Sequence, residues 1–160
     1  MKRKIKMTLE PRSIGAAIKE LQEYKKALER KKNLLIEKLV ERGVEIAKEL
    51  APEDFGDLKN SIQGRTADGK GIIFTDMPYA GFVEFGFGVE GAGSPHPHPE
   101  ISVQYDVNSH GDEGWLYFDV KRGKVRWSKG QPSKPFMYNT ALRLRDEAPK
   151  IAKEVFRGDK

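Results

Sequence analysis

Residues 13–50 have the sequence SIGAAIKELQEYKKALERKKNLLIEKLVERGVEIAKEL, and this stretch decides the fold. Its apolar residues recur at intervals of three, four and seven, the period of a helix with one apolar stripe. We expect a long helix that begins at the N-cap Ser13 and ends before Pro52, with a break or bend at residues 29–33 or at Gly43. The stripe consists of Ile14, Ile18, Leu21, Leu28, Leu35, Leu39, Ile46 and Leu50.

Short strands are expected after this helix, because the sequence period changes from 3.6 to two at Ser61. The pair Asp68-Gly69 is typical of a tight hairpin turn, and a second turn is expected around Gly123. The expected hairpins comprise residues 61–66 with 71–76 and residues 115–120 with 124–127. Residues 101–107 also alternate and are expected as a further strand.

The C-terminal region returns to a helical period over residues 135–157, where Pro149 predicts a kink or a restart. The fold class is therefore α+β, with the N-terminal and C-terminal helices packed on a small antiparallel sheet of short strands. We expect one domain over residues 1–160. Its parts are a basic tail (1–12), the long helix (13–50), strands (61–127) with a long Gly- and Pro-rich loop (86–114), and the C-terminal helix (135–157).

The composition excludes several classes of protein. The chain has 160 residues and no cysteine, which excludes a disulfide scaffold, cysteine-ligated zinc and a thiol nucleophile. We expect no membrane span and no signal peptide, since no run approaches the required length of apolar residues. The net charge of +5 comes from residues 1–50. This basic third could form a solvated helix face or attract DNA, so a nucleic-acid-binding module is the second hypothesis for function.

Candidate catalytic and cofactor motifs are weak. Residues 86–91 have the G-x-G-x-x-G spacing of a dinucleotide-binding loop, but residues 92–99 are rich in proline and cannot begin the helix that such a loop needs. These glycines are expected to form a mobile loop instead. No serine lies in a nucleophile motif, and adjacent carboxylates do not form an acid–base pair. We expect no catalytic residue and no cofactor.

Histidines raise a third hypothesis, a small metal-dependent hydrolase. His96, His98 and His110, with Asp112 and Glu113, could supply the ligands of an open zinc site. However, His96 and His98 alternate with prolines, and in such an extended stretch residues two apart point in different directions. We therefore expect exposed loop histidines and no metal.

Aromatic residues gather in two places. A stacking platform for single-stranded nucleic acid would use such residues, but they more often form a core or a subunit interface. We expect the second role. The residues are Tyr79, Phe82, Phe85 and Phe87 in the first group, and Trp115, Tyr117 and Trp127 in the second.

Three segments carry a resemblance to a known family. They are APEDFGDLKNSI (51–62), YAGFVEFGFG (79–88) and QPSKPFMYNTAL (131–142), with a long helix before them and a helix after them. In this order they resemble the gene-product-ten-like head–tail connector and tail-completion proteins of long-tailed bacteriophages. The resemblance covers about residues 35–157, and Phe55 and Phe87 stand where the family usually has threonine.

The resemblance implies a non-enzymatic part of the virion neck or tail, made in the cytoplasm of the bacterial host. Such proteins form rings, commonly hexameric, that join a head connector or adaptor to the tail tube or tail terminator, and a passing contact with phage DNA is possible. The family pattern carries over to Pro52, Gly56, Leu58, Ser61, Ile62, Tyr79, Ala80, Val83, Glu84, Phe85, Gly86, Pro132, Pro135, Phe136 and Ala141. These are frame and assembly positions.

Glu84 is the one charged residue in its apolar surroundings. A buried carboxylate needs a partner, which could be a backbone cap or an arginine of a neighbouring subunit, so Glu84→Gln is expected to weaken ring assembly. Gly56 and Gly86 would permit tight turns, and Phe136 would fix the last helix on the sheet.

Overall fold

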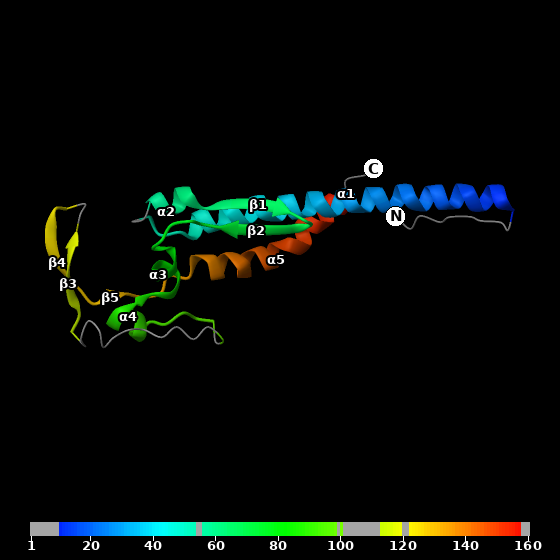
Figure 1. The fold of residues 1–160 in the computed structure, drawn as a ribbon. Helices are drawn as coiled ribbons and strands as arrows, with labels where there is room; N and C mark the ends of the chain where they lie inside the picture. The colour runs from blue at the N-terminus through cyan, green and yellow to red at the C-terminus, as the bar shows by residue number, and fades with distance from the viewer. Residues whose placement is uncertain (1–9, 54–55, 99, 101–112, 120–121, 158–160) are drawn as a thin grey trace.

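The computed structural model describes residues 10–53, 56–98, 100, 113–119 and 122–157. Figure 1 shows an elongated molecule: α1 runs along most of its length, and the hairpin β3–β4 lies at the end opposite the start of α1. The expected α+β class is confirmed. The elements are α1 (Pro11–Leu50), α2 (Gly56–Ser61), β1 (Gln63–Ala67), β2 (Lys70–Phe74), α3 (Ala80–Phe85), α4 (Gly88–Gly93), β3 (Trp115–Asp119), β4 (Lys124–Ser128), β5 (Gly130–Gln131) and α5 (Phe136–Arg157).

Helix α1 is continuous, so the expected break at residues 29–33 or Gly43 is wrong. At Gly43 the missing side chain serves packing: an added Cβ would lie 3.1 Å from Leu144 and would also meet Ile73. Glycine thus lets β2 and α5 approach the helix closely. The helix also begins before Ser13, with Glu10 at the N-cap and Pro11 in the first turn, where proline's fixed φ suits a helix start.

The strands form two separate antiparallel hairpins within the described residues. Hairpin β1–β2 packs on α1, and its turn uses Asp68 and Gly69 with φ of 52° and 71°, as expected for Asp-Gly. Hairpin β3–β4 pairs Trp115 with Ser128 and Asp119 with Lys124 at its two ends. The strand expected at residues 101–107 and residues 1–9 of the expected basic tail (1–12) lie outside the described residues, and the end of that tail belongs to α1, which begins at Pro11.

Two short helices replace parts of the expected strand region. Helix α3 occupies residues 80–85 and α4 occupies residues 88–93, so the expectations of strands and of a loop are wrong there. Isolated bridges join Phe87 to Gln131 and Gly88 to Gly130, which ties this region to β5. The glycines expected to form a mobile loop are therefore part of an ordered junction. None of the helices in the described part of the chain has the length and apolar character that crossing a bilayer requires.

Helix α5 continues through Pro149, so the expected restart does not occur. Figure 1 shows its path turning toward α1 as the colour passes from orange to red. The core lies where α1, α2, α3 and α5 meet, and its central members lie in these helices or directly after them rather than in strands. They are Ala47, Ala51, Leu58, Ile62, Val83 and Phe136, all nearly inaccessible to solvent. Phe136 therefore fixes α5 mainly on other helices.

Candidate assembly site

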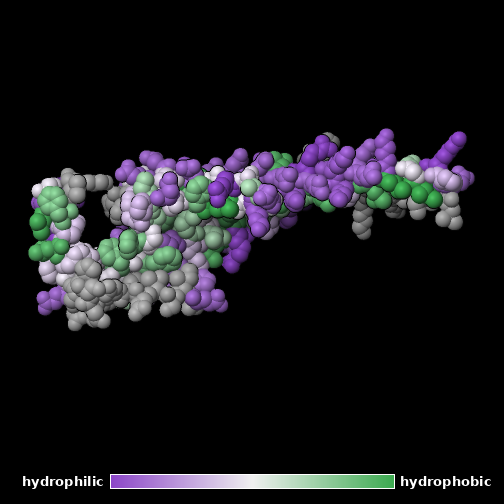
Figure 2. All heavy atoms as spheres, in the orientation of Figure 1, coloured by the Kyte–Doolittle hydropathy of each residue, from purple (hydrophilic) through white to green (hydrophobic). Residues whose placement is uncertain are grey.

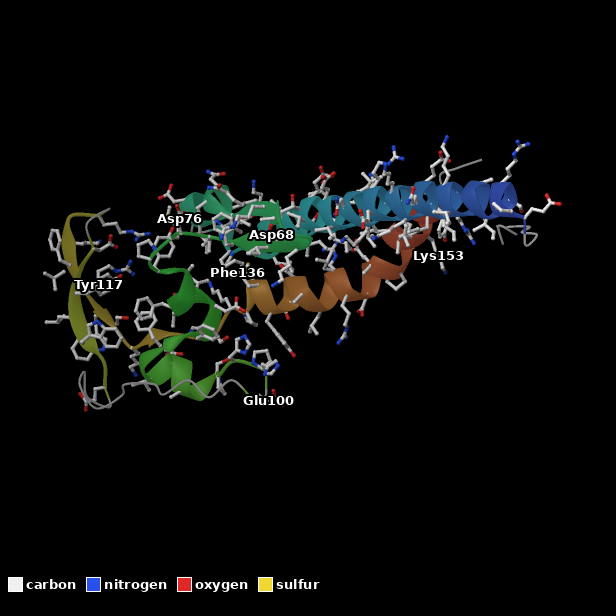
Figure 3. The ribbon with its side chains drawn as sticks, turned by 45° about the vertical axis from the view of Figure 1, so that its right-hand side comes forward. Asp68, Asp76, Glu100, Tyr117, Phe136 and Lys153 are labelled. Carbon is white, nitrogen blue, oxygen red and sulfur yellow. The ribbon has the colours of Figure 1, made fainter. Side chains whose placement is uncertain are left out.

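The structure brings together most of the positions that the resemblance singled out. Pro52 follows α1, and Leu58, Ser61 and Ile62 lie on or directly after α2. Tyr79 to Gly86 form α3 and its two ends, while Pro132 and Pro135 lead into α5. Figure 3 shows Phe136 at the start of α5, beside α3. Three segments distant in sequence thus meet at one junction.

Two positions do not take part in this junction. Gly56 is exposed at the start of α2, where an added Cβ would meet nothing within 4 Å, so the tight turn expected there is wrong. Ala141 is exposed on α5. Ser61 has a local role: its hydroxyl donates to the Leu58 carbonyl oxygen at 2.8 Å and lies 2.6 Å from Thr75 Oγ1.

Glu84 caps the first turn of α5. Its residue is 8% exposed, and its two carboxylate oxygens accept the backbone N–H groups of Met137 and Tyr138, each at 2.9 Å. The first N–H groups of a helix have no partner within the helix, and the positive end of the helix dipole favours a negative charge there. Pro135, directly before the helix, has no side-chain oxygen to cap it. Of the two partners expected for Glu84, the structure shows the backbone cap.

The segment before α5 binds the C-terminal end of α3. Lys134 donates its backbone N–H to the Val83 carbonyl oxygen at 2.8 Å, and Ser133 Oγ donates to the Glu84 carbonyl oxygen at 2.6 Å. Gln131 Nε2 donates to the Phe82 carbonyl oxygen at 2.8 Å. The last carbonyl groups of a helix otherwise lack partners. Residues 131–134 therefore bind α3 at its C-terminal end while Glu84 binds α5 at its N-terminal end.

Gly86 makes this approach possible. Its φ is 75°, and a Cβ at this position would lie 2.6 Å from the Ser133 nitrogen and 2.9 Å from the Gln131 carbonyl oxygen. Only glycine combines that conformation with that space at low cost. The tight turn expected at Gly86 is confirmed.

His96 belongs to the same junction, which the sequence did not reveal. Its residue is 7% exposed, and its ring lies between those of Phe85 and Tyr138, at centroid distances of 5.2 and 5.1 Å. The His98 backbone N–H donates to Nδ1 at 3.2 Å, and Nε2 lies 3.3 Å from Glu84 Oε1. The expectation of an exposed loop histidine is wrong for His96, because Glu84 and two aromatic rings give it a buried site.

Histidine 98 is half-buried, with its ring against that of Tyr138 at 5.4 Å. Across the described residues, no three His, Asp or Glu side chains come together as metal ligands would. Of the other members of the hypothetical zinc site, His110 and Asp112 lie outside the described residues and Glu113 is exposed. The histidines that can be placed contact Glu84, aromatic rings and backbone N–H groups.

An ion-pair network fastens α1 to α5. Arg42 donates to both carboxylate oxygens of Glu147, at 2.7 and 3.2 Å, and Arg143 joins Glu147 to Glu49. The hydrogen bond from Arg42 lowers the pKa of Glu147 to about 2. In turn, the hydrogen bonds that Arg42 donates to Glu147 and Glu45 raise the pKa of Arg42, so both partners remain charged around neutral pH.

Apolar side chains remain exposed at both ends of the molecule. At the hairpin end, Leu116, Phe118, Val125 and Trp127 are 65%, 59%, 60% and 54% exposed. At the other end, Ile18, Leu21 and Leu28 of α1 are 51%, 53% and 45% exposed. Figure 2 shows hydrophobic residues in green over the hairpin at the left edge and along the lower right side of the molecule. The interface role expected for the hairpin aromatics fits Trp127, whereas Tyr79 packs against the core.

A match to a family model indicates a bacteriophage tail component. The family is HK97-gp10-like, described as "Bacteriophage HK97-gp10, putative tail-component", and its model matches residues 15–86. Over this segment, just under half of the chain, the protein is similar to the HK97-gp10-like family. The segment contains α1 from Gly15 onward and ends at Gly86, so it includes the first resembling motif and all but the last two residues of the second. The resemblance of residues 131–142 stays a prediction. Comparisons with curated proteins and with solved structures give no significant match.

Proposed function

We propose that this tail component is a head–tail connector or tail-completion protein that forms a ring, expected as a hexamer, at the neck of the virion. It would join the tail to the DNA-filled head by shape and subunit contacts, without catalysing a reaction. The family match supports the tail assignment. Its partners would be copies of itself, the head connector or adaptor, and the tail-tube or tail-terminator protein.

The observation that carries the ring is the pair of uncovered apolar surfaces. A subunit whose two ends expose different apolar side chains can cover both through contacts between unlike surfaces of neighbouring copies. Contacts between unlike surfaces run head to tail, and they close into a ring when the rotation between neighbours allows it. The junction around Glu84 would keep the elements of each subunit in fixed positions within such a ring.

A deletion experiment tests the neck role. A phage or prophage that lacks the gene is expected to yield full capsids and finished tails that remain separate, and the wild-type gene supplied from a plasmid should restore joined particles. Electron microscopy of particles carrying a tagged copy should place density at the neck. Joined, infectious particles without this protein would contradict the proposal.

Nucleic-acid binding is the second candidate function, and one observation supports it. The part of α1 that extends past α5 in Figure 1 carries exposed basic side chains, including Lys19, Lys25, Lys26 and Arg30. Binding through phosphates must weaken steeply as salt rises, in proportion to the number of phosphates contacted. A neck protein is expected to bind free duplex DNA weakly at all salt concentrations. Strong binding at low salt with a steep salt dependence would favour the second candidate.

A further inference from the structure

The outer hairpin has one wholly apolar face. The register pairs Leu116 with Trp127 and Phe118 with Val125, and since side chains alternate along a strand, these four lie on the same face. The charged residues of the hairpin, Asp119, Lys124 and Arg126, lie on the opposite face. We call the four apolar side chains the hairpin face.

The hairpin would be more stable if another protein surface covered the hairpin face. A two-stranded hairpin is at best marginally stable alone, and the described residues add no third strand to it. Figure 2 shows open space between the outer part of the hairpin and the body of the molecule. With exposures of 54–65%, the four side chains present roughly 400–500 Å² to solvent. A stable pair of proteins needs about 800 Å² from each partner, so this face alone supplies about half of one contact surface.

The second exposed surface continues an internal interface. In α1, Leu35 and Leu39 are half-buried and Ile46 is fully buried, because the C-terminal half of the helix packs against β1, β2 and α5. Figure 1 shows α1 extending past the end of α5. There the same stripe continues through Ile18, Leu21 and Leu28, which are 45–53% exposed while their neighbour Ala17 is buried; we call these three residues the N-terminal stripe.

We propose that the hairpin face of one copy docks on the N-terminal stripe of the next copy. The lengths of the two elements are similar: each five-residue strand of the hairpin spans about 17 Å, and the eleven residues from Ile18 to Leu28 span about 15 Å of helix. Two strands are about as wide as one helix, and a helix laid on a sheet is a stable layer arrangement. The two surfaces lie at opposite ends of an elongated subunit, so they meet only between different copies.

This docking rests on the proposed ring and names the surfaces that form it. It also determines how strong a single contact between neighbouring subunits is. The hairpin face and the N-terminal stripe are each smaller than a stable interface requires, so a single contact is weak. Stable association then depends on closing the ring or on a neighbouring component of the virion.

The absence of cysteine in the sequence allows a direct test. Protein with the single substitution Val125→Cys is mixed with protein carrying Leu21→Cys, at high concentration and with a mild oxidant, so that even a transient contact is captured. Arg126→Cys replaces a residue on the opposite hairpin face and Glu23→Cys lies about 200° further around α1, which gives matched controls. We expect the disulfide between positions 21 and 125 to form at least about fivefold faster than in either control mixture.

Other outcomes overturn the docking. A faster disulfide between two copies of Val125→Cys would mean that hairpins pair with each other, and one between two copies of Leu21→Cys would mean that helices do. A yield at positions 21 and 125 no higher than the controls would reject the contact. Rings seen by electron microscopy without this disulfide would overturn the docking but leave the ring intact. A strong disulfide in a protein that proves dispensable for joining heads to tails would keep the docking and reject the neck role.

Discussion

Replacing Glu84 by glutamine is expected to lower the free energy of unfolding by about 1.5–4 kcal/mol. The carboxylate now accepts the N–H groups of Met137 and Tyr138 and faces Nε2 of His96, in a site that is almost closed to solvent. Glutamine keeps one acceptor oxygen and places an NH₂ group where the second oxygen lies. At least one buried N–H group then loses its acceptor, whichever way the amide is turned.

The magnitude follows from two contributions. A buried donor without a partner costs about 1–3 kcal/mol. Loss of the negative charge at the N-terminus of α5 costs a further 0.3–1 kcal/mol or so, because the charge no longer interacts with the helix dipole. The sum is a large part of the roughly 5–15 kcal/mol that stabilises an ordinary domain. The side chains differ little in size, so packing contributes little to the expected loss.

Urea unfolding followed by circular dichroism at 222 nm measures the effect. Glu90→Gln is the matched control, because Glu90 lies exposed on α4, and it is expected to change stability by less than about 0.5 kcal/mol. Glu84→Ala removes all three contacts and should cost at least as much as Glu84→Gln. If Glu84→Gln is as stable as wild type while Glu84→Ala is not, the side chain matters for packing and the cap interpretation is refuted.

Three further predictions concern the junction, the ion pairs and the hairpin face. Gly86→Ala should lower the free energy of unfolding in urea by about 2 kcal/mol or more, because Gly86 has a positive φ and lies against residues 131–133. Gly81→Ala, in α3 with open space around it, is the control and should be neutral or stabilising. Similar effects of the two substitutions would refute this prediction. The pKa of Glu147 falls from 4.5 to about 2 beside Arg42, so the pair stabilises the fold above about pH 4.5 and this stabilisation is lost as the pH falls toward 2. Between pH 6 and pH 3, the free energy of unfolding should fall less for Glu147→Gln than for wild type. An equal fall in the two proteins would show that another group causes the pH dependence. Phe118→Ser should change stability by less than about 0.5 kcal/mol, since the side chain is exposed, yet reduce joined particles at least tenfold; unchanged particle yield would count against the hairpin face.

The sequence predicted the elements that local signals control. The apolar period of residues 13–50 gave the long helix, and Asp68-Gly69 gave the first hairpin with its turn. The predicted break in α1 was wrong because Gly43 allows close packing instead of ending the helix. Ile73 and Leu144, which are distant in sequence, fill the space that its missing side chain leaves. A glycine within a helical period does not distinguish a break from a close approach.

The junction was only partly predictable. Apolar neighbours around Glu84 indicated that the carboxylate would need a partner, and one of the two partners considered is the one observed. Helix α3 was missed because residues 80–85 are rich in aromatic and β-branched side chains, which favour strands. Contacts with residues 131–134 hold this segment as a helix and override that preference. His96 was missed for a similar reason, since its partners lie at positions 84, 85 and 138.

The junction and the hairpin face are physically connected, which makes the two kinds of variant informative together. The bridges from Phe87 and Gly88 to β5, and the ring of Phe87 at 5.6 Å from that of Trp115, link α3 and α4 to the base of the hairpin. Loosening α3 by Glu84→Gln should therefore weaken both the fold and the contact between copies. A change on the outer face, such as Phe118→Ser, alters no contact within the junction and should weaken only the contact between copies. If both variants lose assembly and only the first loses stability, the defect in the second lies in the surface itself, because its fold is intact.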